Sequence, residues 1–331
     1  MSLSITRGSM PSEQSLTPTL GNLDQCVGLT GESVGTRTLG VLEPSDNDHG
    51  KGAGKGLVFL TGAKLYFILT GFAVQVGLPR LFDSPAEFGD YSLAMSTVSV
   101  LNNVLIASTI QSISKRVSEA EGSTAARLRQ GLRIQFCVGL VLAGALFSAA
   151  PWLGRVAYDP GLSVLLRRVS AVPLCYAVYA TLVGTLNGQR RFRQQAALDA
   201  TFSTLRSVGI LGAAALGLGV LGAVSGFAMA AVGVLCVALW SVGIGAKGEA
   251  LPLRTWFGFL LPLAAFQATL NGTLLLDVWA VKNTLAGLGI ASGLALEQAA
   301  EQSARFVAFY RAGQTFALVP YQVILSVTFV V

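Results

Sequence analysis

The sequence predicts an all-α, polytopic membrane protein. Residues 207–246 contain no charged side chain. As one helix this stretch would be roughly 60 Å long, about twice the hydrocarbon thickness of a bilayer. A glycine-rich break at 217–222 divides it, so we expect two spans joined by a tight hairpin. The composition agrees, because 52% of the residues are hydrophobic, only 12% are charged, and the mean hydropathy is +0.61.

Similar windows, each long enough to cross a bilayer, recur along the chain. With the hairpin counted as two spans, they predict about eight transmembrane helices. The first window is interrupted only by Lys64, and the last reaches Val331 in mid-span. We therefore expect the chain to be part of a longer protein. The windows outside the hairpin lie at 57–79, 91–114, 134–154, 169–189, 255–276 and 312–331.

Residues 1–55 have a different composition, rich in Ser, Gly, Thr and Asp. They hold too few large apolar side chains to offset the entropy of ordering, so we predict a disordered tail without a signal peptide. The only histidine, His49, lies in this tail. The four cysteines are scattered without the spacing of a metal site. We therefore expect no metal, no cofactor and no disulfide.

Lysine and arginine are unevenly divided between the two sets of alternate loops. The set that includes the tail holds twelve, and the other set holds seven. Because these residues are retained on the cytoplasmic side in short loops, the tail and the loops at 115–133 and 189–193 should face the cytoplasm. Arginines between 155 and 168 run against this bias. The asymmetry accounts for much of the net charge of +6, so we expect no nucleic-acid partner.

Polar side chains inside the predicted spans are costly unless they face protein or a water-filled cavity. Small side chains at helical spacing allow close packing of helices or line a cavity, and the sequence leaves both open. The second span carries such a face at Ser92, Ser96, Ser99 and Asn103. The seventh span offers a second polar set at Gln267, Asn271, Thr273 and Asp277.

Two cations lie within predicted spans. Lys64 is roughly 10 Å deep by helical rise, so it either snorkels to the interface or faces a cavity. Arg206 could pair with Asp199, with a neighbouring helix or with a bound anion. A third candidate, Lys282, lies at the end of the seventh span.

Four short motifs appear in a consistent order. Residues 84–91 read SPAEFGDY, residues 186–192 read LNGQRRF, and residues 277–282 read DVWAVK. Residues 310–315 read YRAGQT and are followed by VPYQ at 319–322. In order and spacing they resemble the loop and helix-end motifs of polysaccharide flippases, the Wzx-type branch of the MATE-like superfamily.

The resemblance covers residues 57–331 and implies a V-shaped transporter of two helical lobes. It would carry a polyprenyl-pyrophosphate-linked oligosaccharide across the bacterial inner membrane by alternating access, without chemistry on the substrate. The family has further helices beyond these eight. It also has a short loop where this chain has residues 285–304, so this region departs from the family's pattern.

The expected organisation follows from these observations. Residues 1–55 form a cytoplasmic tail, and 56–246 form a first six-helix lobe. Residues 247–331 begin a second lobe with two helices and a long loop at 282–306. We expect the first lobe to pack compactly and the last two spans to protrude from it.

An anionic substrate fits the basic candidates best. A pyrophosphate-linked sugar needs a hydrated cavity with positive charge, for which Lys64, Arg206 and Lys282 are candidates, together with Asn103 and Asn271. The alternative is a MATE-type exporter of cationic drugs, which Asp199 and Asp277 keep open. The coupling ion, proton or sodium, is left open. The spans show no nucleophile beside a base, so we expect no enzyme activity.

Overall fold

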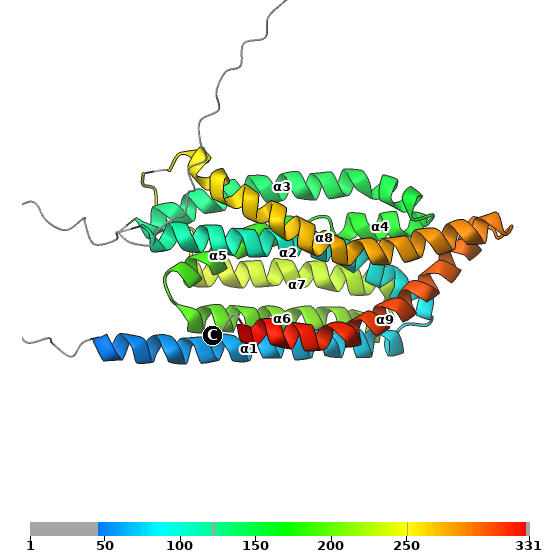
Figure 1. The fold of residues 1–331 in the computed structure, drawn as a ribbon, viewed down its shortest axis with the longest axis horizontal. Helices are drawn as coiled ribbons and strands as arrows, with labels where there is room; N and C mark the ends of the chain where they lie inside the picture. Colours follow the sequence, from blue (N-terminus) through cyan, green and yellow to red (C-terminus); the bar gives the residue numbers. More distant parts are fainter. Residues whose placement is uncertain (1–45, 121–122, 250, 329–331) are drawn as a thin grey trace, which may run out of the picture. The chain divides into compact units, whose positions relative to one another are not determined.

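The computed structural model describes residues 46–120, 123–249 and 251–328, and these residues are almost entirely helical (Figure 1). The predicted tail at 1–55 therefore lies mostly outside the described residues. The helices are α1 (Asp46–Leu81), α2 (Pro85–Ser118), α3 (Thr124–Val156), α4 (Pro160–Val169), α5 (Val172–Gly188), α6 (Phe192–Ala215), α7 (Gly219–Val242), α8 (Leu253–Ala291) and α9 (Leu296–Thr328).

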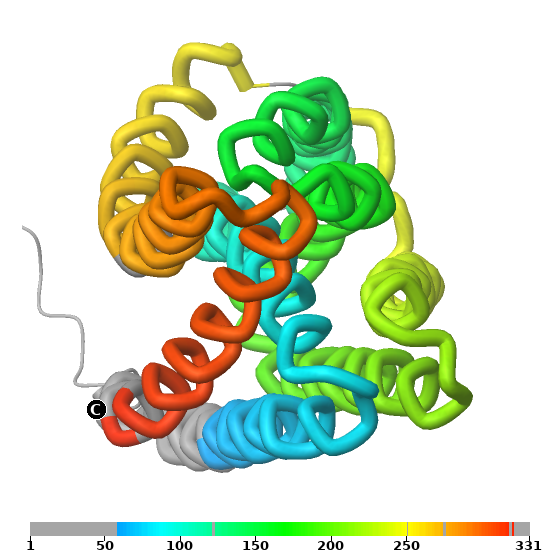
Figure 2. Tube along the Cα trace, turned by 90° about the vertical axis from the view of Figure 1, so that its right-hand side faces the viewer, coloured from blue at the N-terminus to red at the C-terminus, as the bar shows by residue number. Residues whose placement is uncertain are grey.

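Helix α2 is the centre of the arrangement. It packs against α5 on one side and against α8 and α9 on the other, while α1 packs on α6 and α6 on α7. Seen along the helices, α8 and α9 lie together on one side of α2, and α9 slopes across toward α1 (Figure 2). The nine helices of the described ranges belong to one compact unit.

The turns between helices follow from local sequence signals. Ser84 caps α2 by accepting a hydrogen bond from the Glu87 N–H at 3.4 Å, and Pro85 occupies the first helical turn. Asp159 caps α4 in the same way, accepting from the Leu162 N–H at 3.2 Å. The glycine break inside 207–246 is confirmed, because Gly217 adopts a φ of +73° between α6 and α7.

Five helices in the described ranges are long and apolar enough to cross a membrane, or six if the bent α8 counts as one span. Helices α4 and α5 together make one of these spans, Pro160–Gly188. Helix α6 is not among the five, and it carries Asp199 and Arg206 along its length. Four of the predicted windows, 57–79, 91–114, 134–154 and 255–276, lie within single helices, whereas 169–189 crosses the break between α4 and α5.

Two predicted boundaries were wrong. Residues 46–55 belong to α1 rather than to a tail. The predicted loop at 282–306 is helical except for residues 292–295. Its Ala, Leu, Glu and Gln residues are strong helix formers, so they lengthen α8 and α9 instead of forming a loop.

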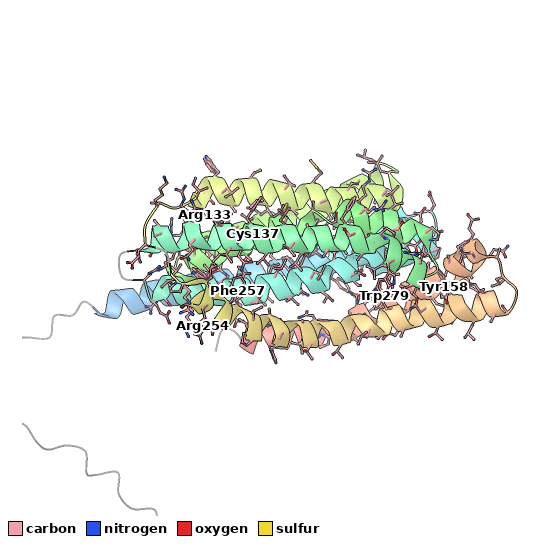
Figure 3. All side chains as sticks on the ribbon, turned by 90° about the horizontal axis from the view of Figure 1, so that it is seen from above. Arg133, Cys137, Tyr158, Arg254, Phe257 and Trp279 are labelled. Atoms are coloured by element: carbon pink, nitrogen blue, oxygen red, sulfur yellow. The ribbon has the colours of Figure 1, made fainter. Side chains whose placement is uncertain are left out.

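Helices α8 and α9 form a hairpin that contacts α2 through specific polar groups. The indole N–H of Trp279 donates to the Thr97 hydroxyl at 3.1 Å. Phe72 of α1 meets Phe316 of α9 edge to face, with ring centroids 5.7 Å apart. In Figure 3, Trp279 lies toward the end that carries Tyr158, and Arg254 and Phe257 mark the start of α8 at the opposite end. Assignment of this hairpin to a second lobe stays a prediction.

Candidate substrate cavity

A cavity of about 310 Å³ lies among α1, α2, α6 and α9. This is the lower end of the range usual for ligand pockets, so it suits a head group better than a whole oligosaccharide. Its walls combine aromatic side chains of α1 and α2 with polar ones from all four helices. The polar lining consists of Gln75, Ser92, Ser96, Ser99, Asn103, Arg206, Arg311 and Thr315.

The charged groups on this cavity are both positive. Arg206 projects from α6 and stacks over the Phe67 ring, with its guanidinium carbon 5.2 Å from the ring centroid. Arg311 enters from α9. Among the described residues that line the cavity there is no carboxylate. The site therefore presents two guanidinium groups to whatever enters it.

The polar face predicted on the second span points into this cavity. Ser92, Ser96, Ser99 and Asn103 all line it. The buried hydroxyl oxygens of Ser92 and Ser96 have no hydrogen-bond partner in the protein, and the same is true of Oε1 of Gln75 and Nε of Arg206. Since buried polar groups are costly when unpaired, these atoms are placed to bind a polar ligand or water.

Asn103 also ties the cavity to α8. Its amide nitrogen donates to Oδ1 of Asn271 at 3.1 Å, and Asn271 in turn donates to the Gln267 carbonyl at 2.9 Å. Asn271 thus contacts a lining residue without lining the cavity itself. Asn103 and Asn271 are 168 residues apart in the sequence, so only the fold brings them together.

Asp277 acts on the cavity through Gln314. Its Oδ2 accepts hydrogen bonds from the Tyr310 hydroxyl at 2.7 Å and from Nε2 of Gln314 at 2.9 Å. Gln314 accepts a hydrogen bond from Arg311 through its other amide atom. Sequence reasoning missed Arg311 because it stands at the edge of an apolar window and reads as a loop charge. The YRAGQT motif that contains it was the available signal.

Lys64 and Asp199 lie away from the cavity lining. Asp199 accepts a hydrogen bond from the Tyr179 hydroxyl at 3.1 Å, and the opposite charge of Lys64 acts on it from α1. The suggested ion pair between Asp199 and Arg206 does not form among the described side chains. Both acids of the drug-exporter alternative are therefore engaged by protein groups.

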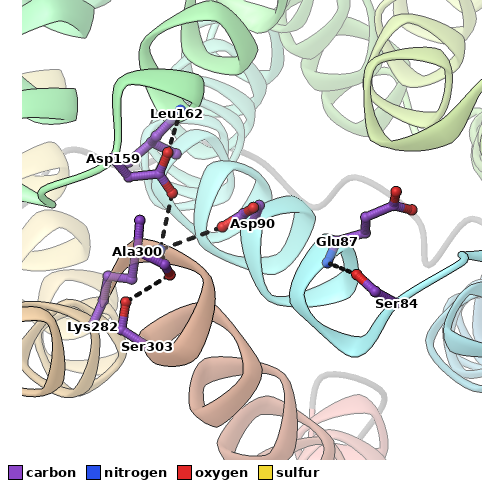
Figure 4. Close-up of polar contacts among 8 residues, drawn as sticks. All are labelled: Ser84, Glu87, Asp90, Asp159, Leu162, Lys282, Ala300 and Ser303. Atoms are coloured by element: carbon purple, nitrogen blue, oxygen red, sulfur yellow. Dashed lines mark hydrogen bonds and ion pairs between the residues drawn. The ribbon is translucent and has the colours of Figure 1, made fainter. Parts of the chain in front are cut away.

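Lys282 is completely buried, and it too is away from the cavity. Its Nζ lies 2.9 Å from Oδ2 of Asp159 and 3.4 Å from Oδ1 of Asp90. It also donates to the carbonyl of Ala300 at 3.0 Å. Figure 4 shows these contacts converging on one nitrogen. Lys282 is thus committed to two carboxylates rather than to a substrate.

The fold is that of a transporter of the MATE type. One similar solved structure is an outward-facing multidrug resistance MATE family transporter of the MOP superfamily, at a TM-score of 0.58 and 16% identity over 83% of this chain and 62% of that one. A eukaryotic MATE transporter gives 0.56 and 16%, over 84% and 69%. The chain thus spans less than two thirds of the first of these proteins.

A third similar structure is a MOP superfamily transporter from Pyrococcus furiosus, with a TM-score of 0.54 and 16% identity over 84% of this chain and 70% of that one. The family model described as "Polysaccharide biosynthesis protein" matches residues 78–276, more than half of the chain. The chain belongs to this family. No curated protein sequence matches it.

Proposed function

We propose that this protein flips a polyprenyl-pyrophosphate-linked oligosaccharide across the bacterial inner membrane, with its N-terminus in the cytoplasm. The single observation that carries this proposal is the charge of the cavity. Arg206 and Arg311 face it from α6 and α9, and the described lining holds no carboxylate. A cationic drug would meet repulsion there, whereas a diphosphate would gain two charge-assisted sets of hydrogen bonds.

The remaining lining suits the rest of such a substrate. Serine hydroxyls and the amides of Gln75 and Asn103 supply donors and acceptors for a sugar. The prenyl tail stays in the bilayer, so the cavity needs to shelter only the diphosphate and the adjoining sugar while they cross. No bond of the substrate is made or broken, and the protein contributes binding energy and a polar path.

Family membership and the related folds support this reading. The family is one of polysaccharide biosynthesis proteins. The Pyrococcus furiosus transporter is described as having a binding pocket of reverse polarity that suggests a different function. The fold is therefore compatible with cavities of different charge, and the charge of each cavity is the feature to test.

A binding experiment on the purified full chain tests the proposal. The probes are farnesyl diphosphate and farnesol, which share a prenyl tail and differ in the charged head. We expect binding of the diphosphate only, and a loss of about tenfold or more, or about 1.4 kcal/mol, in Arg206→Gln and in Arg311→Gln.

The matched control is Arg305→Gln, because Arg305 lies on α9 as well but is exposed and paired with Glu301 at 2.6 Å. It should bind the diphosphate as the unmodified protein does. Equal binding of farnesol and its diphosphate would overturn the proposal. Tight binding of tetraphenylphosphonium, a lipophilic cation, would favour the drug-exporter alternative instead.

A further inference from the structure

The buried cluster around Lys282 joins four separate elements of the fold. Asp90 comes from α2, Asp159 from the turn before α4, Lys282 from α8, and the Ala300 carbonyl from α9. All four lie at the end of the bundle where α1 turns into α2, α3 into α4 and α8 into α9 (Figures 1 and 4). The loop charges predict that this end faces away from the cytoplasm.

The two carboxylates and the ammonium of this cluster come from different segments of the chain. Both carboxylates belong to segments that precede α8, and the ammonium of the cluster belongs to α8. Side-chain exposure falls from 31% for Asp90 to 10% for Asp159 and 0% for Lys282. Water therefore reaches one edge of the cluster but not the lysine. Separating α8 from α2 would pull opposite charges apart and hydrate all three.

A second contact, between the backbones of α2 and α9, lies at the same end of the bundle. Gly89 of α2 lies against Ala304 of α9, so that a Cβ built on Gly89 would be 1.9 Å from the Ala304 carbonyl oxygen. Only glycine permits this approach of two backbones. Gly89 directly precedes Asp90, so steric fit and ion pairing act side by side between the same elements.

The turn that carries Asp159 is held in an uncommon conformation. Tyr158 has a φ of 54°, the left-handed region that side chains other than glycine rarely adopt. From this turn, one oxygen of Asp159 caps α4 and the other accepts from Lys282. The turn therefore orients the Asp159 carboxylate toward the position that Lys282 takes when α8 packs against it.

We propose that Gly89, Asp90, Asp159 and Lys282 form a gate, and that closing it places Arg311 opposite Arg206. Ala300 and Arg311 lie on the same helix, roughly 16 Å apart by helical rise. With the start of α9 fixed at the gate, its later part reaches the cavity among α1, α2 and α6. When the gate opens, α9 moves away and the two arginines separate. Lys282 is thus a positioning residue for Arg311 in the cavity.

Partial opening is disfavoured, because a buried ammonium that loses its carboxylates without gaining water is strongly destabilised. The gate therefore has two states, paired and closed or hydrated and open. The part of this inference that concerns Arg311 rests on the proposed function, and the part that concerns the gate does not.

The test follows the accessibility of one residue inside the gate. Ser303 is 1% exposed and donates its hydroxyl to the same Ala300 carbonyl that accepts from Lys282. In the reconstituted full chain with its native cysteines replaced, Ser303→Cys reports opening through its rate of reaction with a membrane-impermeant maleimide. We expect Gly89→Ala to raise that rate at least tenfold by holding the gate open.

Gly287→Ala is the matched control, since Gly287 lies on α8 close to Lys282 with open space around it. It should leave the labelling rate unchanged. If Gly89→Ala does not fold, Lys282→Gln and Lys282→Arg serve instead. The glutamine should open the gate, and the arginine, which keeps the charge, should return labelling toward the original rate. Equal rates in all variants, or equal effects of glutamine and arginine, would overturn the gate.

The link to the cavity has its own readout. The same variants are tested for farnesyl diphosphate affinity, and an open gate should weaken it at least fivefold although Gly89 does not line the cavity. Failure of the unmodified protein to bind the diphosphate would contradict the proposed function while the labelling still tests the gate. Faster labelling with unchanged affinity would overturn the positioning role alone.

Discussion

Gly209 of α6 and Gly226 of α7 touch through their backbones. A Cβ built on Gly226 would lie 2.1 Å from the Gly209 carbonyl oxygen, and one built on Gly209 would lie 2.6 Å from that of Gly226. Helices approach this closely only where both side chains are absent. Gly226 therefore serves the packing of α7 against α6 within the chain.

Replacing Gly226 by valine should force α6 and α7 apart. Overpacking of this kind costs about 1–3 kcal/mol, and we expect the free energy of unfolding to fall by that amount. Denaturant unfolding in detergent measures it. The control is Gly212→Val on α6, where a Cβ meets nothing within 4 Å. Similar losses in the two variants would show that valine in these helices, rather than the glycine contact, sets the effect.

Lys64 and Asp199 should stabilise each other across α1 and α6. A double-mutant cycle with Lys64→Gln and Asp199→Asn measures this in the free energy of unfolding, and coupled neighbours typically show about 0.5–3 kcal/mol. Lys64→Arg keeps the charge and should retain most of the coupling. Additive effects of the two single changes would contradict an electrostatic contact and return Lys64 to snorkelling at the interface.

The hydroxyl of Tyr179 should matter for the same carboxylate. It donates to Asp199 at 3.1 Å from α5, so Tyr179→Phe leaves a half-buried acceptor without its donor. We expect a loss of about 1–3 kcal/mol in the free energy of unfolding. The loss should shrink in an Asp199→Leu background, where no acceptor remains. An undiminished loss there would assign the effect to tyrosine packing.

Local patterns in the sequence were enough to predict the helical fold. Long apolar windows and the glycine break before α7 are properties of neighbouring residues, and they mark helices and a turn correctly. The boundary errors at α1, α8 and α9 arise because charged and small residues can extend a helix beyond the apolar part that crosses the membrane. Hydropathy marks the span and does not mark the helix end.

The site was predicted less completely, because its geometry depends on distant pairs. Lys282 could have faced a cavity, but it meets Asp159 and Asp90, which lie 123 and 192 residues away in the sequence. Asn103 and Arg206 do line the cavity. Arg311 lies on it only because α9 leans across α2 toward α1. No spacing rule within one helix could show that arrangement.

The direction of α2 through the membrane can be tested at its two ends. Ser118 is its last residue and Asp83 precedes its first turn, and both are exposed. In intact cells, with the four native cysteines replaced, Asp83→Cys should react with an impermeant thiol reagent and Ser118→Cys should react only after lysis. The reverse pattern would invert the predicted orientation of the whole chain.

Gln314 should strengthen diphosphate binding in the cavity by holding Arg311 in place. It accepts from Arg311 and donates to Asp277 at 2.9 Å, whereas the Tyr310 hydroxyl donates to Asp277 and makes no side-chain hydrogen bond to Arg311 among the described residues. We therefore expect Gln314→Ala to weaken farnesyl diphosphate binding by about two- to tenfold, the change in affinity that the loss of one hydrogen bond causes. The Arg311 guanidinium would then no longer be held in place by Gln314.

Tyr310→Phe is the matched control, since it removes another hydrogen bond to the same carboxylate and leaves the Arg311–Gln314 contact in place. It should bind the diphosphate with nearly unchanged affinity. In the double variant Gln314→Ala with Arg311→Gln, the loss should be no greater than in Arg311→Gln alone, because Gln314 acts through Arg311. Additive losses would show that Gln314 contacts the diphosphate by itself, and an equal loss in Tyr310→Phe would move the anchoring role to Asp277.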